Sequence, residues 1–132
     1  LKHKSNLSYV FKTISHLLTD NGVIIIEDPS LLECIKKNSY DQFYNEHIYL
    51  FSALSIKILL KKFNLVIFDV KNLQTHGGSL RYYIKRKENK KISVSKNVKL
   101  QLKREINFGL NKLSIYQKFS KNAKKSKIKY FE

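Results

Sequence analysis

Acid and base groups are concentrated in one short stretch, residues 40–47, which read YDQFYNEH. It holds two tyrosines, two carboxylates and a histidine. An imidazole is largely neutral at pH 7 and can accept a proton, and a nearby carboxylate can hold its charged form. The stretch therefore predicts acid/base chemistry, with His47 as the first candidate for the base.

A second polar cluster lies further along the chain, where residues 75–81 read THGGSLR. The adjacent Gly77 and Gly78 allow a turn in which the backbone can approach a ligand closely. We expect the two clusters to form one active site.

The first elements are predicted by apolar spacing. Residues 6–19 repeat apolar side chains at the period of an amphipathic helix, which residues 20–22 end, with Gly22 in a left-handed cap position. Residues 23–26, VIII, are typical of a strand buried on both faces. The order helix, tight turn, buried strand predicts a parallel sheet.

The later elements follow from capping residues and periodicity. Ser30 is expected to cap a short helix that reaches residue 37, and Ser52 a second helix over residues 53–63. Residues 64–73 and 79–86 are predicted strands that pair antiparallel at a sheet edge. From residue 93 onward the spacing predicts one long helix, or two with a break near Gly109.

Two carboxylates, Glu27 and Asp28, directly follow the first predicted strand. In α/β sheets, ligands bind beyond the carboxyl ends of the strands, so this is a position for a binding site. A solvated turn with Asp28 as a local cap explains the same residues without a ligand.

Composition limits the class of protein. The chain has 132 residues, 42% hydrophobic and 12% aromatic, which predicts one folded domain with no run long enough to span a bilayer. The single cysteine, Cys34, cannot form an internal disulfide or a metal site by itself, so we expect a cytoplasmic protein without a metal. Because the chain has no Met and no apolar signal region, we also expect it to be part of something longer.

The net charge of +16 is unevenly distributed. Of the 26 basic residues 17 lie after residue 80, with only 3 of the 10 acidic ones. One hypothesis is a nucleic-acid-binding tail. Codon bias is the simpler interpretation, because Lys far outnumbers Arg and no basic-motif fold is evident.

Three motifs in order resemble a known family. Residues 27–29 (EDP), 40–47 and 76–81 (HGGSLR) are similar to S-adenosylmethionine-dependent C-methyltransferases that act on nucleotide-linked keto-deoxysugars. The resemblance covers residues 7–83. It implies an α/β fold, the C-terminal half of a Rossmann-like class I methyltransferase domain in residues 1–92. Residues 93–132 would be a helical segment leading toward a further domain.

The resemblance also implies a chemistry. A carbon beside a ketone must lose a proton before it attacks the methyl group, so a base and an enolate-stabilising donor are required. His47 would be the base, and the family's Tyr and Glu correspond to Tyr44 and Glu46. Which of these two contacts the sugar and which orients His47 stays open.

The remaining motif residues would bind substrate, with Arg81 a candidate for its phosphate. The others are Glu27, Tyr40, Asp41, His76, Gly77 and Gly78. Each has a plainer interpretation: His47 as a structural histidine, and Arg81 as a solvated residue on a sheet edge.

The chain also departs from the family. The Gly-rich loop that binds S-adenosylmethionine is not found, since the only glycines are Gly22, Gly77, Gly78 and Gly109. The cofactor-binding residues are therefore unknown, and we expect this chain to need a separate cofactor-binding half to turn over. A non-catalytic remnant or partner subunit of the same fold is the competing hypothesis.

Overall fold

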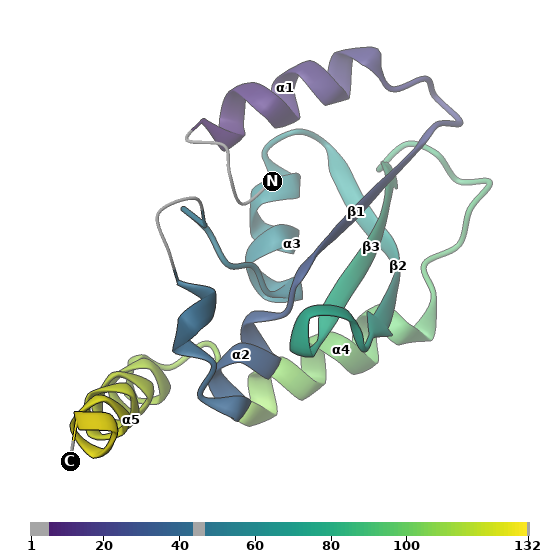
Figure 1. The fold of residues 1–132 in the computed structure, drawn as a ribbon. Coiled ribbons are helices and arrows are strands. Elements are labelled where there is room, and N and C mark those ends of the chain that lie inside the picture. The colour runs from purple at the N-terminus through teal and green to yellow at the C-terminus, as the bar shows by residue number, and fades with distance from the viewer. Residues whose placement is uncertain (1–5, 44–46, 132) are drawn as a thin grey trace.

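The computed structural model describes residues 6–43 and 47–131, with His76 and residues 129–131 as backbone only. The element order is α1, β1, α2, η1, α3, β2, η2, β3, α4, α5, where η marks a 3-10 helix. Figure 1 shows the three strands as one twisted sheet with helices beside it and α5 extending away from it.

The first helix, α1 (Leu7–Leu17), confirms the predicted amphipathic helix. Its N-cap is Asn6, whose side chain accepts a hydrogen bond from the Tyr9 amide at 2.9 Å. The predicted left-handed cap at Gly22 is wrong, because the helix ends earlier, at Leu18, in extended backbone. A Cβ on Gly22 would lie 2.6 Å from Leu18 Cδ1, so the Leu18 side chain would have to shift to accept a larger residue.

The sheet has the order β1-β3-β2, formed by β1 (Val23–Pro29), β3 (Ser79–Arg86) and β2 (Leu65–Leu73). The predicted antiparallel pairing of β2 with β3 is confirmed. The predicted parallel sheet is wrong for the described residues, because β3 lies between β1 and β2 and runs opposite to both. For the same reason β3 is a central strand and not an edge.

The prediction that β1 is buried on both faces is also wrong. Ile24 and Ile26 pack against the core, whereas Val23 is exposed and Ile25 is 59% exposed. The reason is that α1 and α3 (Ala53–Lys61) pack on the same face of the sheet (Figure 1), so no described element covers the other side of β1.

The two short connecting helices have the caps that the sequence predicts. Ser30 caps α2 (Leu31–Lys37) by accepting from the Glu33 amide. Ser52 caps α3 in a reciprocal capping box with Ser55. Both predicted helices are confirmed, α3 ending two residues earlier than expected.

The core lies between the sheet and the helices on its covered face. Its buried members come from α1, α3, α4, β2 and β3, and from Phe51 before α3. They are Phe11, Phe51, Ala53, Ile56, Leu60, Leu65, Ile67, Val70, Leu80, Tyr82, Ile84 and Val98.

The C-terminal part forms two helices, α4 (Lys96–Phe108) and α5 (Leu113–Phe131), so the alternative with a break is confirmed. Gly109 makes the break in the left-handed conformation, at φ +97°. The start of α4 is fixed to the sheet because the Ser95 amide donates to the Phe68 carbonyl at 2.7 Å, where a β-bulge interrupts the β2–β3 register.

Near its end, α4 also supplies a cap to another helix. The Glu105 carboxylate accepts from the Ala53 and Leu54 amides, both at 2.9 Å, at the N-terminus of α3. A second hydrophobic cluster contains the buried Leu32, Ile35 and Leu110, and Tyr116 and Phe119 of α5 pack against it. No helix among the described residues is both long and apolar enough to cross a membrane.

Candidate functional site

Three segments of the chain are joined at the end of β1. There the Ser30 amide donates to the Gly78 carbonyl at 2.9 Å, and the next amide, Leu31, donates to the Phe51 carbonyl at 3.0 Å. Ser30 and Phe51 also form an isolated parallel bridge. Two consecutive residues after β1 therefore hold the Gly-Gly turn on one side and Phe51, four residues after His47, on the other.

The Gly-Gly turn connects β2 to β3 through η2 (Thr75–Gly77). Gly77 has φ +77° and Gly78 has φ +128°, conformations that side chains rarely adopt. The close approach seen at this turn is to protein. A Cβ on Gly78 would lie 2.8 Å from Glu33 Cγ, whereas one on Gly77 would meet open space.

Glu27 and Arg81 are directly opposite each other on β1 and β3 and form an ion pair. Arg81 Nη2 and Nε donate to Glu27 Oε2 at 2.8 and 3.1 Å, and Thr75 Oγ1 donates to Oε1 at 3.3 Å. Hydrogen bonding to Glu27, with a smaller effect of Tyr83, raises the pKa of Arg81. The edge position in the plainer interpretation of Arg81 is wrong, because β3 is the central strand, whereas its solvated character is confirmed, since the side chain is 37% exposed.

His47 is buried, with 8% of its surface exposed, and its Nδ1 lies 2.8 Å from the Gln42 carbonyl oxygen. A carbonyl only accepts hydrogen bonds, so this contact requires the proton on Nδ1 and makes Nε2 the basic nitrogen of the neutral ring. The fixed tautomer meets one requirement for a general base.

Tyr40 and Asp41 lie in η1 (Tyr40–Gln42), directly after α2. Tyr40 is exposed, and Asp41 is close enough to Cys34 to affect its ionisation. Burial, assisted by the charge of Asp41, raises the pKa of the Cys34 thiol to about 11. The thiol donates to the Ser39 carbonyl at 3.1 Å, as a packed, unreactive cysteine does.

Two predicted catalytic residues, Tyr44 and Glu46, lie outside the described residues, and so does the side chain of His76. Asp28 is buried, at the core face of β1. In the described part of the chain, no group of three or more His, Cys, Asp or Glu side chains could hold a metal ion.

Several residues that support the site were not identified from the sequence. The main one is Glu33, which packs under Gly78 and forms an ion pair with Arg104 of α4 at 2.6 Å. Lys37, one turn later on α2, donates to the Gly77 carbonyl. The spacing of Glu33 and Lys37 on one helix was a visible signal, but the contact with Arg104 was not, because it joins residues far apart in the sequence.

Comparison with known proteins gives two matches along the chain. Residues 1–70 match a family model described as a methyltransferase domain, and residues 74–132 match one described as a C-methyltransferase C-terminal domain. The first match covers more than half of the chain. The chain belongs to the methyltransferase family.

One curated relative of this methyltransferase chain is the C-methyltransferase NovU of Streptomyces niveus, 33% identical over 78 residues. The match spans 59% of this chain and 19% of that protein. β1 and His47 lie within the methyltransferase-domain match, and Thr75 to Arg81 within the C-terminal match. The junction at the end of β1, formed by Ser30, Leu31, Phe51 and Gly78, is therefore built from both matched parts of the methyltransferase.

Proposed function

We propose that this chain carries the substrate-side part of an S-adenosylmethionine-dependent C-methyltransferase. It would act on the carbon beside the ketone of a nucleotide-linked deoxysugar. The observation that carries the proposal is the junction at the end of β1, where Ser30 and Leu31 join the Gly-Gly turn to Phe51, four residues after His47. The two family matches and the similarity to a C-methyltransferase support it.

In the proposed reaction, His47 Nε2 takes the proton from the carbon next to the ketone. The electron pair of the broken C–H bond moves into the C–C bond, and the ketone oxygen becomes an enolate oxygen. The contact between Nδ1 and the Gln42 carbonyl supports this role, because it holds the tautomer that leaves the basic lone pair on Nε2. Tyr44 is our candidate donor to the enolate oxygen, and Glu46 our candidate for orienting the imidazole or accepting a sugar hydroxyl.

Arg81 is our candidate for the phosphate of the nucleotide. Glu27 uses Oε2 for Arg81 and Oε1 for Thr75, so in this proposal it positions the guanidinium instead of contacting the sugar. The other proposed substrate-binding residues are Tyr40, Asp41, His76, Gly77 and Gly78.

The described residues do not fit a cradle for S-adenosylmethionine. The only adjacent glycines are Gly77 and Gly78, and Gly78 is packed against the Glu33 side chain. We therefore assign to this chain the removal of the proton, and derive no step through the cofactor. The cofactor-binding half would lie outside residues 1–132, and a separate chain is our candidate for it.

The uncovered face of β1 supports such a partner. Val23 and Ile25 are exposed in consecutive outward positions of the strand, although both are strand-forming apolar residues. A partner that covers this face is also compatible with a non-catalytic subunit, the competing function. Methyl-transfer activity distinguishes the catalytic function from the non-catalytic one.

The test combines this chain with a cofactor-binding half and measures methyl transfer to nucleotide-linked keto-deoxysugars. We expect activity only in the mixture, and its loss in His47→Asn. The matched control is His16→Asn. His16 Nδ1 also lies against a backbone carbonyl, that of Lys12 at 2.7 Å, but the residue is on the exposed side of α1. A mixture that binds both halves but never transfers a methyl group would favour the non-catalytic function.

A further inference from the structure

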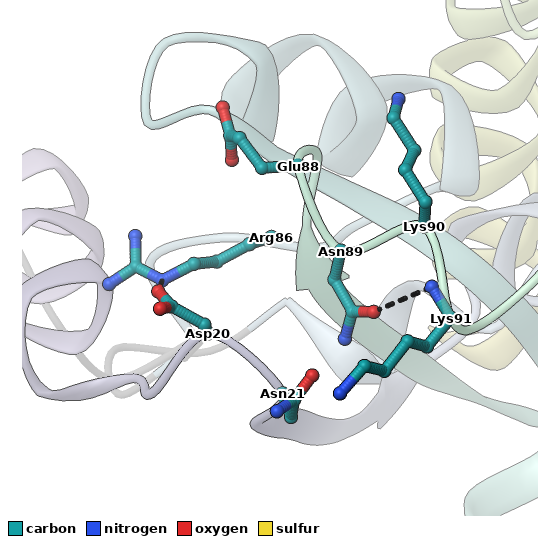
Figure 2. A pocket seen from close by; sticks show the side chains of 7 residues that line it. All are labelled: Asp20, Asn21, Arg86, Glu88, Asn89, Lys90 and Lys91. Atoms are coloured by element: carbon teal, nitrogen blue, oxygen red, sulfur yellow. Dashed lines mark hydrogen bonds and ion pairs between the residues drawn. The ribbon is translucent and has the colours of Figure 1, made fainter.

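A pocket lies at the end of the sheet opposite to the candidate site. It is lined by the turn after α1 and by the loop after β3, and its volume is about 560 Å³ (Figure 2). The register places the two sites at opposite ends of the same strands, because Val23 pairs with Lys85 at one end and Pro29 with Ser79 at the other. The lining residues are Asp20, Asn21, Arg86, Glu88, Asn89, Lys90 and Lys91.

Asn89 gives this pocket a buried hydrogen-bond donor. The residue is only 6% exposed, and its Oδ1 accepts from the Lys91 amide at 3.0 Å. Its Nδ2 has no hydrogen-bond partner among the described residues. Figure 2 shows this nitrogen on the side of the pocket formed by Asn21 and Lys91. A buried donor without a partner is destabilising by roughly 1–3 kcal/mol, so a ligand that accepts from it is favoured.

The charges around Asn89 favour an anion. Asp20 is paired with Arg86 at 3.8 Å, while Glu88 accepts from the neutral Asn64 amide and keeps its charge, so the cations that line the pocket outnumber its carboxylates by one. Arg86 is engaged as well, since its Nη2 donates to the Ser15 and Leu18 carbonyls at the end of α1, both at 2.6 Å.

The two lysines that line the pocket have no carboxylate partner among the described residues. Lys91 and Lys90 form no ion pair within residues 6–43 and 47–131, and Figure 2 shows Lys90 pointing away from Asn89. Lys85 is buried and is not one of the lining residues, and its ammonium donates to the carbonyls of Asn89 and Ile92. The backbone carbonyls of Asn89 and Ile92 are thus held next to the positive charge of Lys85.

We propose that this pocket binds a small oxyanion of the phosphate class, through Asn89 Nδ2 and Lys91 Nζ, with the Asn21 amide at its rim. The ligand is either free phosphate or the phosphoryl group of a larger molecule. The site is independent of the proposed methyl transfer, because none of its lining residues belongs to the junction at the end of β1, which is formed by Ser30, Leu31, Phe51 and Gly78.

The test is a titration of the full 132-residue chain with inorganic phosphate at constant ionic strength, followed by amide chemical shifts. We expect saturable shifts confined to residues 20–21 and 86–92. Asn89→Asp keeps the oxygen that accepts from the Lys91 amide and replaces the Nδ2 donor by an acceptor. It should weaken phosphate binding by a factor of roughly 10 or more, since a charge-assisted hydrogen bond is lost and a like charge is added.

Lys91→Gln should also weaken binding several-fold, whereas Lys121→Gln, the same charge change on exposed α5, should leave it unchanged. A nucleoside monophosphate that shifts the same residues with higher affinity would assign the ligand to a larger phosphorylated molecule. Equal weakening by all three substitutions, or shifts that do not saturate, would overturn the proposal, because both describe non-specific attraction to a basic protein.

Discussion

The carboxylate of Glu105 is predicted to hold α4 to α3, and its removal should destabilise the whole domain. The side chain is 0% exposed and accepts three hydrogen bonds at 2.9 Å, from the Ala53 and Leu54 amides and from Gln101 Nε2. In Glu105→Gln, the amide oxygen can stay at the Oε1 position and serve Ala53 and Gln101. The new NH₂ group then faces the Leu54 N–H, donor against donor.

The magnitude follows from these contacts. One charge-assisted hydrogen bond is lost, worth about 1.5–3 kcal/mol, and the negative charge at the N-terminus of α3 is lost as well, worth about 0.3–1 kcal/mol. We expect the free energy of unfolding to fall by about 3 kcal/mol, which corresponds to a drop in Tm of about 10 °C for a chain of this size.

Urea unfolding followed by circular dichroism measures this loss, with an unchanged m-value as evidence that the folded state is intact. The matched control is Glu88→Gln, where an exposed carboxylate accepts from Asn64, and a change within about 0.5 kcal/mol is expected. If Glu105→Gln is no more destabilising than Glu88→Gln, the capping role of Glu105 is refuted.

Three further predictions concern single residues. Gly78→Ala should lower the free energy of unfolding by about 2–3 kcal/mol, because φ is +128° and the new Cβ would contact Glu33, whereas Gly77→Ala should cost about 1 kcal/mol; equal losses in urea unfolding would contradict the contact. Burial, with the charges of Glu105 and Asp28, raises the pKa of Tyr82 well above 10. The unfolded chain therefore loses this proton first, and stability should fall by up to about 1.4 kcal/mol per pH unit above pH 10. Tyr82→Phe should remove this contribution to the loss of stability between pH 9 and 11. Identical losses in the wild type and in Tyr82→Phe would contradict the raised pKa of Tyr82. Cys34, with its pKa raised to about 11, should react with a thiol reagent at pH 8 roughly 100-fold more slowly in the folded chain than in urea, and equal rates would exclude the packed thiol.

Local signals predicted most of the secondary structure. The spacing of apolar residues located α1, and the capping residues Ser30 and Ser52 marked the starts of α2 and α3, because a helix start depends on a few adjacent residues. The sheet was less predictable. A run such as VIII is compatible with burial on two faces or on one, and its partner strand is decided by residues far along the chain.

The candidate site was predictable to a similar extent. The motifs identified Glu27, Arg81 and His47, but not that Glu27 and Arg81 pair with each other, because that depends on the β1–β3 register. The approach of the Gly-Gly turn to a ligand stays a prediction, and the contact of Gly78 with Glu33 was not predicted. Such contacts between distant segments follow from the tertiary structure and leave no local pattern.

Solvent exchange tests, without methyl transfer, the proposal that His47 removes a proton from the carbon beside a ketone. The assembled enzyme is incubated in deuterium oxide with the nucleotide-linked keto-deoxysugar and no methyl donor, and deuterium at that carbon is measured by mass spectrometry. We predict exchange with the wild-type chain and with His16→Asn, and none above background with His47→Asn. Full exchange with His47→Asn would contradict the account and assign the base to another residue.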